Sequence, residues 1–178
     1  CEAAHASGGL STMAWTYAGK VRRMDNKLIR YPGHITVINT MRDLGFFSQD
    51  PVEVAGKKIA PRALAALLFE RHFDRPGDKD LVVIRVTARG TKDGRRAEAV
   101  YDMMDFYDDK TKLTAMMRTT GFPAAIVANM LASGIINKPG AYPVETGVPA
   151  EPFLREAKKR GFKLTDSFRF IGPVTAEV

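Results

Sequence analysis

Apolar residues recur at helical spacing in two segments of the first half of the chain. In residues 33–45, GHITVINTMRDLG, the positions Val37, Met41 and Leu44 fall at i, i+4 and i+7, and the segment ends on a glycine. Residues 61–73, PRALAALLFERHF, begin with a proline, which suits the first position of a helix. One side of this second segment carries a stripe of Leu64, Leu67, Leu68 and Phe73. The spacing predicts an amphipathic helix in each segment.

Two further helices are predicted in the second half of the chain. Residues 119–134, TTGFPAAIVANMLASG, are apolar with helical spacing and end on a glycine. Because proline is tolerated only near the start of a helix, Pro123 places the predicted N-terminus near Thr119 or Thr120. Residues 149–161, PAEPFLREAKKRG, have a proline near the start, basic residues in the last turn and a glycine stop.

Alternation with a period of two residues marks the clearest strands. It runs through residues 80–108, is interrupted by GTKDG and then resumes, which predicts an antiparallel hairpin. A final strand is expected in FKLTDSFRFIG, and Pro32 favours an extended conformation for the residues just before it. The predicted fold class is α+β, with helices flanking a mixed, mostly antiparallel sheet. No repeat or linker divides the sequence, so we expect residues 1–178 to form a single domain.

Composition places the chain among ordinary globular proteins. Apolar residues make up 45% and charged residues 26% of the 178 residues, and no apolar run is long enough to cross a bilayer, so we expect a soluble, cytoplasmic protein. The lone Cys1 cannot form an internal disulfide, and no Cys/His cluster has metal-ligand spacing, which favours a reducing compartment and a metal-free fold. The opening CEAAHASGGL resembles neither a natural start nor a signal peptide, so we expect a fragment of a longer protein.

The net charge of +7 raises the question of nucleic-acid binding. The densest basic stretches, KVRR and KKR, are short, and aromatic residues do not alternate with them as a base-stacking surface would require. A solvated basic surface, or one that attracts an anionic substrate, is the favoured interpretation. We expect neither a nucleic-acid nor a membrane partner.

Two clusters of polar residues stand where a fold normally exposes side chains. Arg30, Tyr31 and His34 surround a Pro-Gly turn, and RTTG occupies residues 118–121. An arginine can hold a carboxylate in bidentate fashion, and the free N–H groups of a helix N-terminus together with threonine hydroxyls favour an anion. Histidine can donate or accept a proton near neutral pH. The two clusters together would suit an amino-acid ligand.

Each of these residues also has a structural interpretation. His34 shares a helical face with apolar residues and is as well explained as the edge of a core. Thr119 and Thr120 can simply cap their helix, Arg30 can be a surface charge, and Tyr31 a half-buried phenol.

Two other motifs are better explained by structure than by chemistry. SGGL lacks both an upstream strand and the spacing of a dinucleotide fingerprint, so a flexible turn explains it. Four acidic residues gather near the end of the hairpin, and the lysines that follow them favour a solvated strand end over a metal site or an acid–base pair: Asp102, Asp105, Asp108 and Asp109.

Four blocks of the sequence carry a resemblance to a known family. They are SGGLSTMAWTYAGKVRRMDNKLIRYPGH, MRDLGFF, TAMMRTTGFPAAIVANMLASGII and VPAEPFLREAKKRGFKL. In their order and spacing they resemble the C-terminal catalytic domain of the saccharopine dehydrogenase and lysine 6-dehydrogenase group, from about residue 7 to about residue 163. The long helical insertion of the fungal saccharopine reductases is not seen, which favours the compact branch of the group.

The resemblance implies a two-part enzyme. In this family an N-terminal Rossmann domain holds NAD or NADP, and the second domain, whose sheet resembles the C-terminal domain of glyceraldehyde-3-phosphate dehydrogenase, binds the amino-acid substrate and forms a homodimer. The implied chemistry is reversible hydride transfer from an amine-bearing carbon to the nicotinamide, which gives an imine that hydrolyses to a carbonyl. No glycine fingerprint follows a strand here, so we expect this chain alone to bind dinucleotide poorly and to be inactive.

The resemblance also assigns roles by position. The segment containing Gly8, Gly9 and Thr12 matches the family segment that runs between the two domains, and these residues become candidates for cofactor contact. RYPGH and RTTG match segments that line the substrate side of the cleft. The candidates there are Arg30 and Arg118 for the substrate carboxylate, Tyr31 and His34 for proton transfer, and Thr119, Thr120 and Gly121 for further hydrogen bonds.

Two alternatives remain open at this point. The first is a non-catalytic dimeric module that kept the fold without the turnover, and the second and weaker one is a nucleic-acid-binding domain. The sequence does not choose between lysine, saccharopine or another amine, nor between NAD and NADP.

Overall fold

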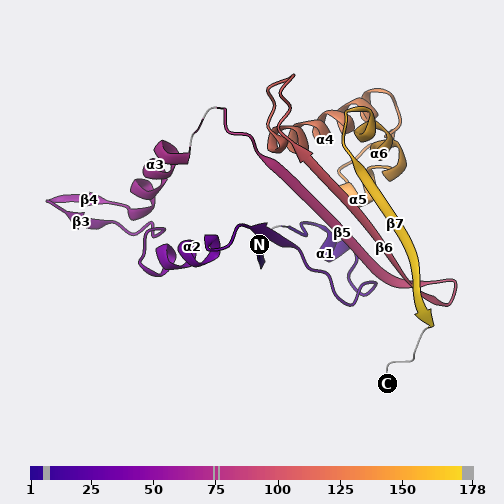
Figure 1. Ribbon diagram of the computed structural model, residues 1–178, viewed down its shortest axis with the longest axis horizontal. Coiled ribbons are helices and arrows are strands. Elements are labelled where there is room, and N and C mark those ends of the chain that lie inside the picture. The colour runs from indigo at the N-terminus through magenta and orange to yellow at the C-terminus, as the bar shows by residue number, and fades with distance from the viewer. Residues whose placement is uncertain (6–8, 74, 76, 174–178) are drawn as a thin grey trace. The chain divides into compact units, whose positions relative to one another are not determined.

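A computed structural model describes residues 1–5, 9–73, 75 and 77–173, which group into two compact units, 1–77 and 78–178 (Figure 1). The first contains, in chain order, β1 (Glu2–His5), α1 (Met13–Thr16), β2 (Lys27–Arg30), α2 (His34–Asp43), β3 (Val52–Val54), β4 (Lys57–Ile59) and α3 (Pro61–Phe73). The second contains β5 (Leu81–Lys92), β6 (Arg95–Phe106), α4 (Ala115–Ala132), α5 (Val144–Gly147), α6 (Ala150–Lys159) and β7 (Leu164–Pro173).

The first unit pairs its strands in two small antiparallel sheets. β1 pairs with β2, and β3 pairs with β4. The turn between β3 and β4 places both Ala55 and Gly56 at positive φ, 51° and 75°, which is the geometry of a type I′ hairpin turn. The helices predicted in this unit are confirmed, and α3 begins at the predicted Pro61 and ends at Phe73.

The second unit is built on a three-stranded antiparallel sheet in the order β5-β6-β7. Asp93 and Gly94, at φ values of 52° and 69°, form the type I′ turn of the β5–β6 hairpin, which confirms the prediction made from the alternating pattern. β7 pairs with β6 and is the predicted final strand. Together with the helices this gives the predicted α+β class, and every strand pair among the described residues is antiparallel.

The core of the second unit lies where α4 and α6 pack together, at the end of the sheet where β7 begins (Figure 1). Ile126, Met130, Ala157 and Phe162 are buried together, and Met103 of β6 packs against them. Burying an isoleucine, methionine or phenylalanine side chain stabilises a fold by roughly 1.5–3 kcal/mol. The helices therefore cover the face of the sheet that carries Met103.

The predicted start of α4 is wrong. The helix begins at Ala115, where the Thr114 hydroxyl accepts a hydrogen bond from the Met117 N–H at 3.0 Å. The carboxylate of Asp80 accepts two more from the first-turn amides, so all of these otherwise unpaired donors are satisfied. Pro123 lies inside the helix at a cost of about 3 kcal/mol, which the burial of the residues that follow it offsets.

One buried charge of the second unit is the guanidinium of Arg118 on α4, which is 8% exposed. It donates from Nε and Nη2 to the carboxylate of Asp105 at 2.9 and 3.3 Å, and from Nη1 to Asp108 at 3.2 Å. The rings of Phe122 and Phe162 lie 5.2 and 5.6 Å from its central carbon. Asp105 is 6% exposed, so the prediction that these aspartates form a solvated strand end is wrong for this one.

The opposite face of the sheet is charged. Glu98 on β6 accepts hydrogen bonds from Arg89 on β5 at 2.6 Å and from Arg169 on β7 at 2.9 and 2.5 Å. The hydrogen bond from Arg89, followed by that from Arg169, holds the pKa of Glu98 below its usual range. Both arginine side chains stay about 70% exposed, so part of the basic balance of the sequence is a solvated sheet surface.

We predict that replacing Arg118 by Met lowers the free energy of unfolding by about 3–5 kcal/mol, because Asp105 would stay buried without its counter-charge. Urea unfolding followed by circular dichroism measures the change. The double variant Arg118→Met/Asp105→Leu should recover most of the loss, because it removes both charges of the buried ion pair. Arg85→Met is the control, since that arginine pairs with Asp102 on the exposed face; an equal loss in the control would contradict the prediction.

A second prediction concerns Glu156 on α6, whose carboxylate accepts from Lys159 and Arg160 at 2.7 Å each. These hydrogen bonds, the one from Lys159 first, lower the pKa of Glu156 from 4.5 to about 2. A carboxyl whose pKa is lower in the folded state stabilises the fold above the unfolded pKa, and this contribution is lost as the pH falls.

The stability difference between the unsubstituted chain and Glu156→Gln should therefore be full above pH 4.5 and disappear as the pH falls to about 2. Unfolding free energies measured across that interval test it. Glu151→Gln, at the exposed start of the same helix, controls for the loss of one surface carboxylate. A difference that stays constant over the interval would refute the assignment.

Candidate functional site

The candidate site in the first unit is the turn that joins β2 to α2. β2 ends at Arg30, and α2 begins at His34 after Gly33, which adopts φ 92°. A side chain at that φ would be strained, so the glycine is required by the turn. The His34 N–H donates to the Tyr31 carbonyl at 3.3 Å, which closes the turn.

All three polar residues of this turn are exposed. Tyr31 is 76% exposed, and Arg30 and His34 are exposed as well. Tyr31 is therefore not a half-buried phenol, and His34 does not lie at the edge of a core. Arg30 donates from one terminal nitrogen to the carbonyl of Ile29 at 2.9 Å, which steadies the side chain at its base. The turn therefore presents a guanidinium, a phenol and an imidazole from one short segment.

A carboxylate that the sequence did not single out holds this turn in place. Glu2 on β1 stands opposite Arg30 in the β1–β2 register. Its Oε1 accepts the Gly33 N–H, and its Oε2 accepts the Ile35 N–H at 3.0 Å. The hydrogen bond from Gly33, followed by that from Ile35, lowers the pKa of Glu2. No local pattern signals this contact, because the bonded residues are more than thirty positions apart.

The segment predicted to contact a cofactor is only partly described. Gly8 lies outside the described residues. A Cβ added at Gly9 would lie 1.7 Å from the side-chain amide nitrogen of Asn26. The glycine therefore allows the Asn26 side chain to pack closely against the backbone. Thr12 precedes the short helix α1 at φ −71°. The cofactor role of all three residues stays a prediction.

The RTTG segment of the second unit lies within α4 and not at its N-terminus, so the predicted anion site at free helix N–H groups is wrong. Thr119 donates its hydroxyl proton to the Ala115 carbonyl at 2.8 Å, and the Thr120 hydroxyl lies 3.8 Å from the sulfur of Met116. A Cβ added at Gly121 would meet open space.

Arg118, the first residue of RTTG, has its guanidinium enclosed by the two carboxylates and the two rings described above. These contacts favour a structural role. A role for RTTG in substrate binding stays a prediction, as does its meeting with Arg30, because the two clusters belong to different units.

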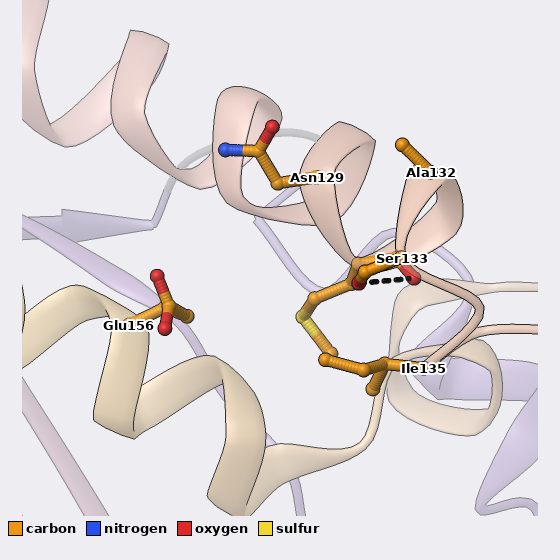
Figure 2. A pocket seen from close by; sticks show the side chains of 6 residues that line it. Asn129, Ala132, Ser133, Ile135 and Glu156 are labelled. Carbon is orange, nitrogen blue, oxygen red and sulfur yellow. Dashed lines mark hydrogen bonds between the residues drawn. The ribbon is translucent and has the colours of Figure 1, made fainter.

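One surface depression of the second unit is lined by none of these candidates. It is lined by Asn129, Met130, Ala132, Ser133, Ile135 and Glu156 (Figure 2). Figure 2 shows Glu156 on its own side of the depression, and its carboxylate is already held by Lys159 and Arg160. The Ser133 hydroxyl donates to the Met130 carbonyl at 3.4 Å. This depression offers a ligand few free polar groups.

Two features of the described residues bear on other functions. Among residues 1–5, 9–73, 75 and 77–173, no three His, Cys, Asp or Glu side chains gather so that they could hold a metal ion. None of the helices in that part of the chain is both long and apolar enough to cross a membrane.

The turn at residues 30–34 thus exposes groups that can bind a carboxylate and exchange a proton. Comparison with protein families gives a match to the saccharopine dehydrogenase C-terminal domain across residues 2–162. The match covers most of the chain, from the strand that carries Glu2 through the turn and on to the end of α6. This chain therefore belongs to the family of saccharopine dehydrogenase C-terminal domains.

Proposed function

We propose that this chain is the substrate domain of an NAD(P)-dependent oxidoreductase of saccharopine or lysine type, which acts on an amine-bearing carbon of an amino acid. The observation that carries the proposal is the family match over residues 2–162. The exposed Arg30, Tyr31 and His34 support it, because they share one turn whose backbone is fixed by hydrogen bonds.

The roles follow from the chemistry of the groups. Arg30 binds the carboxylate of the amino acid, since a guanidinium fork matches the two oxygens of a carboxylate. An ammonium group has no lone pair to form a C=N bond, so the substrate must lose a proton before oxidation. His34 is the group placed to take that proton, and Tyr31 contributes a hydroxyl that can hydrogen-bond to the same amine.

In this proposal the dinucleotide is not held mainly by this chain. The space beside Gly9, which a pyrophosphate would need in order to approach the backbone, is filled by the side chain of Asn26. We therefore assign cofactor binding mainly to a Rossmann domain outside this sequence. Orientation and proton exchange are what this domain supplies.

The turnover prediction is tested on the full-length protein. With NAD or NADP and either lysine or saccharopine, we expect the reduced nicotinamide to accumulate and its absorbance to rise. Arg30→Ala should raise the KM for the amino acid about tenfold or more, because it removes a hydrogen-bonded partner of a charged group. Arg42→Ala is the matched control, since that exposed arginine pairs only locally with Asp43 in the described contacts.

Equal KM values in the two variants would remove Arg30 from the site. The absence of turnover with every amine, in a full-length protein that is folded and binds dinucleotide, would leave the non-catalytic module as the better proposal.

We also propose that the protein is a homodimer. β5 is an edge strand of the described sheet, and its apolar side chains Val83 and Val86 are 54% and 55% exposed. Long edge strands with exposed apolar residues are normally covered.

Sedimentation of the full-length protein should give the mass of two copies. Val83 and Val86 lie on opposite faces of β5. The variants Val83→Lys and Val86→Lys therefore compare how much each face contributes to the dimer. A monomer at every concentration would contradict the proposal.

A further inference from the structure

The first turn of α2 lacks a cap of its own. Gly33 occupies the N-cap position and has no side chain with which to accept the unpaired amides of the helix start. The His34 N–H is satisfied by the Tyr31 carbonyl, and the Gly33 and Ile35 N–H groups are both satisfied by Glu2. The cap therefore comes from a different element, the strand β1.

The two accepted amides stand on either side of His34. One belongs to the residue before it and the other to the residue after it, so a single carboxylate fixes the backbone on both sides of the imidazole. The same strand fixes the other end of the turn, because Glu2 is the register partner of Arg30. One residue thus ties together both ends of the segment that presents the guanidinium and the imidazole.

We propose that Glu2 is the positioning residue of the site, setting the spacing between Arg30 and His34 through its two hydrogen bonds to the start of α2. This rests on the function proposed above. Both carboxylate oxygens of Glu2 accept backbone amides of the turn, which assigns it to holding the turn. Its lowered pKa keeps it ionised at neutral pH, which strengthens both bonds.

A positioning role and a merely stabilising role make different predictions. If Glu2 only stabilised the unit, its loss would lower the melting temperature and leave the kinetics of the folded protein unchanged. If it sets the turn, its loss frees the Gly33 and Ile35 amides and lowers kcat/KM even where the protein remains folded.

The experiment uses the full-length protein and the variants Glu2→Ala and Glu2→Gln, with Glu53→Gln as the control because Glu53 is an exposed carboxylate of the same unit. Hydrogen exchange of a peptide spanning residues 31–36 reports on the two amides, and a peptide from α3 serves as the internal reference. In Glu2→Ala we expect exchange to be about tenfold faster or more in the peptide of residues 31–36. The exchange rate of the α3 peptide should not change. Glu2→Gln keeps one carbonyl acceptor and should lie between.

Kinetics complete the test. We expect kcat/KM for the amino acid to fall about tenfold or more in Glu2→Ala, by less in Glu2→Gln, and not at all in Glu53→Gln. In the His34→Gln background the further loss on removing Glu2 should be much smaller, because a residue that acts through His34 has little left to position. Thermal unfolding confirms that each variant is folded.

The outcomes separate the two proposals. Unchanged exchange at residues 31–36 overturns the geometric claim, and faster exchange with unchanged kcat/KM overturns the positioning role. Full additivity with His34→Gln also overturns it. A full-length protein that binds dinucleotide and oxidises no amine overturns the proposed function instead, whatever the exchange data show.

Discussion

The second unit depends on the compensation of one buried positive charge. A guanidinium taken out of water is tolerated only where its charge is balanced and its N–H groups are bonded. Arg118 meets this condition with Asp105, from the end of β6, and Asp108, from the loop after it. Its Nη2 also donates to the carbonyl of Arg160 at the end of α6. Three elements are thus fixed to a single side chain.

This anchor also fixes how α4 faces the sheet. Arg118, Phe122, Ile126 and Met130 are spaced four residues apart and lie along one face of the helix. Three of them are apolar or aromatic and enter the core, and the fourth brings the charge that β6 balances. A rotation of the helix would both remove the apolar residues from the core and separate the ion pair. The two kinds of contact therefore enforce the same orientation.

Where one local pattern decided the structure, the sequence sufficed. The stripe of α3 together with its initial proline gave the bounds of that helix, and the Asp93–Gly94 turn with its flanking alternation gave the long hairpin. The β3–β4 hairpin was missed because Ala55 rather than a glycine or an asparagine takes the first left-handed position of its turn. β1 was missed because its pairing partner lies far along the chain.

The start of α4 and the character of RTTG were misjudged for a related reason. The amides of the first turn are satisfied by Asp80, which comes from the other side of a long hairpin. Pro123 looked like a helix start because the cost of a proline inside a helix can be read from the sequence. The burial that offsets this cost depends on tertiary packing, which the sequence does not display. Spacing likewise cannot distinguish an arginine that binds a ligand from one that closes a core. The exposed turn at Arg30 was predictable because a Pro-Gly turn is local.

The two pairings of the first unit differ in the length of chain that they close. β3 and β4 meet across a two-residue turn, whereas β1 and β2 must bring together residues separated by most of the first thirty positions. Closing the longer loop costs more chain entropy before any stabilising contact can form, so the shorter hairpin forms more readily. The turn that follows β2 receives its cap only after the longer closure. Trimming the chain ahead of β2 would therefore leave the sequence of that turn intact and its geometry undefined.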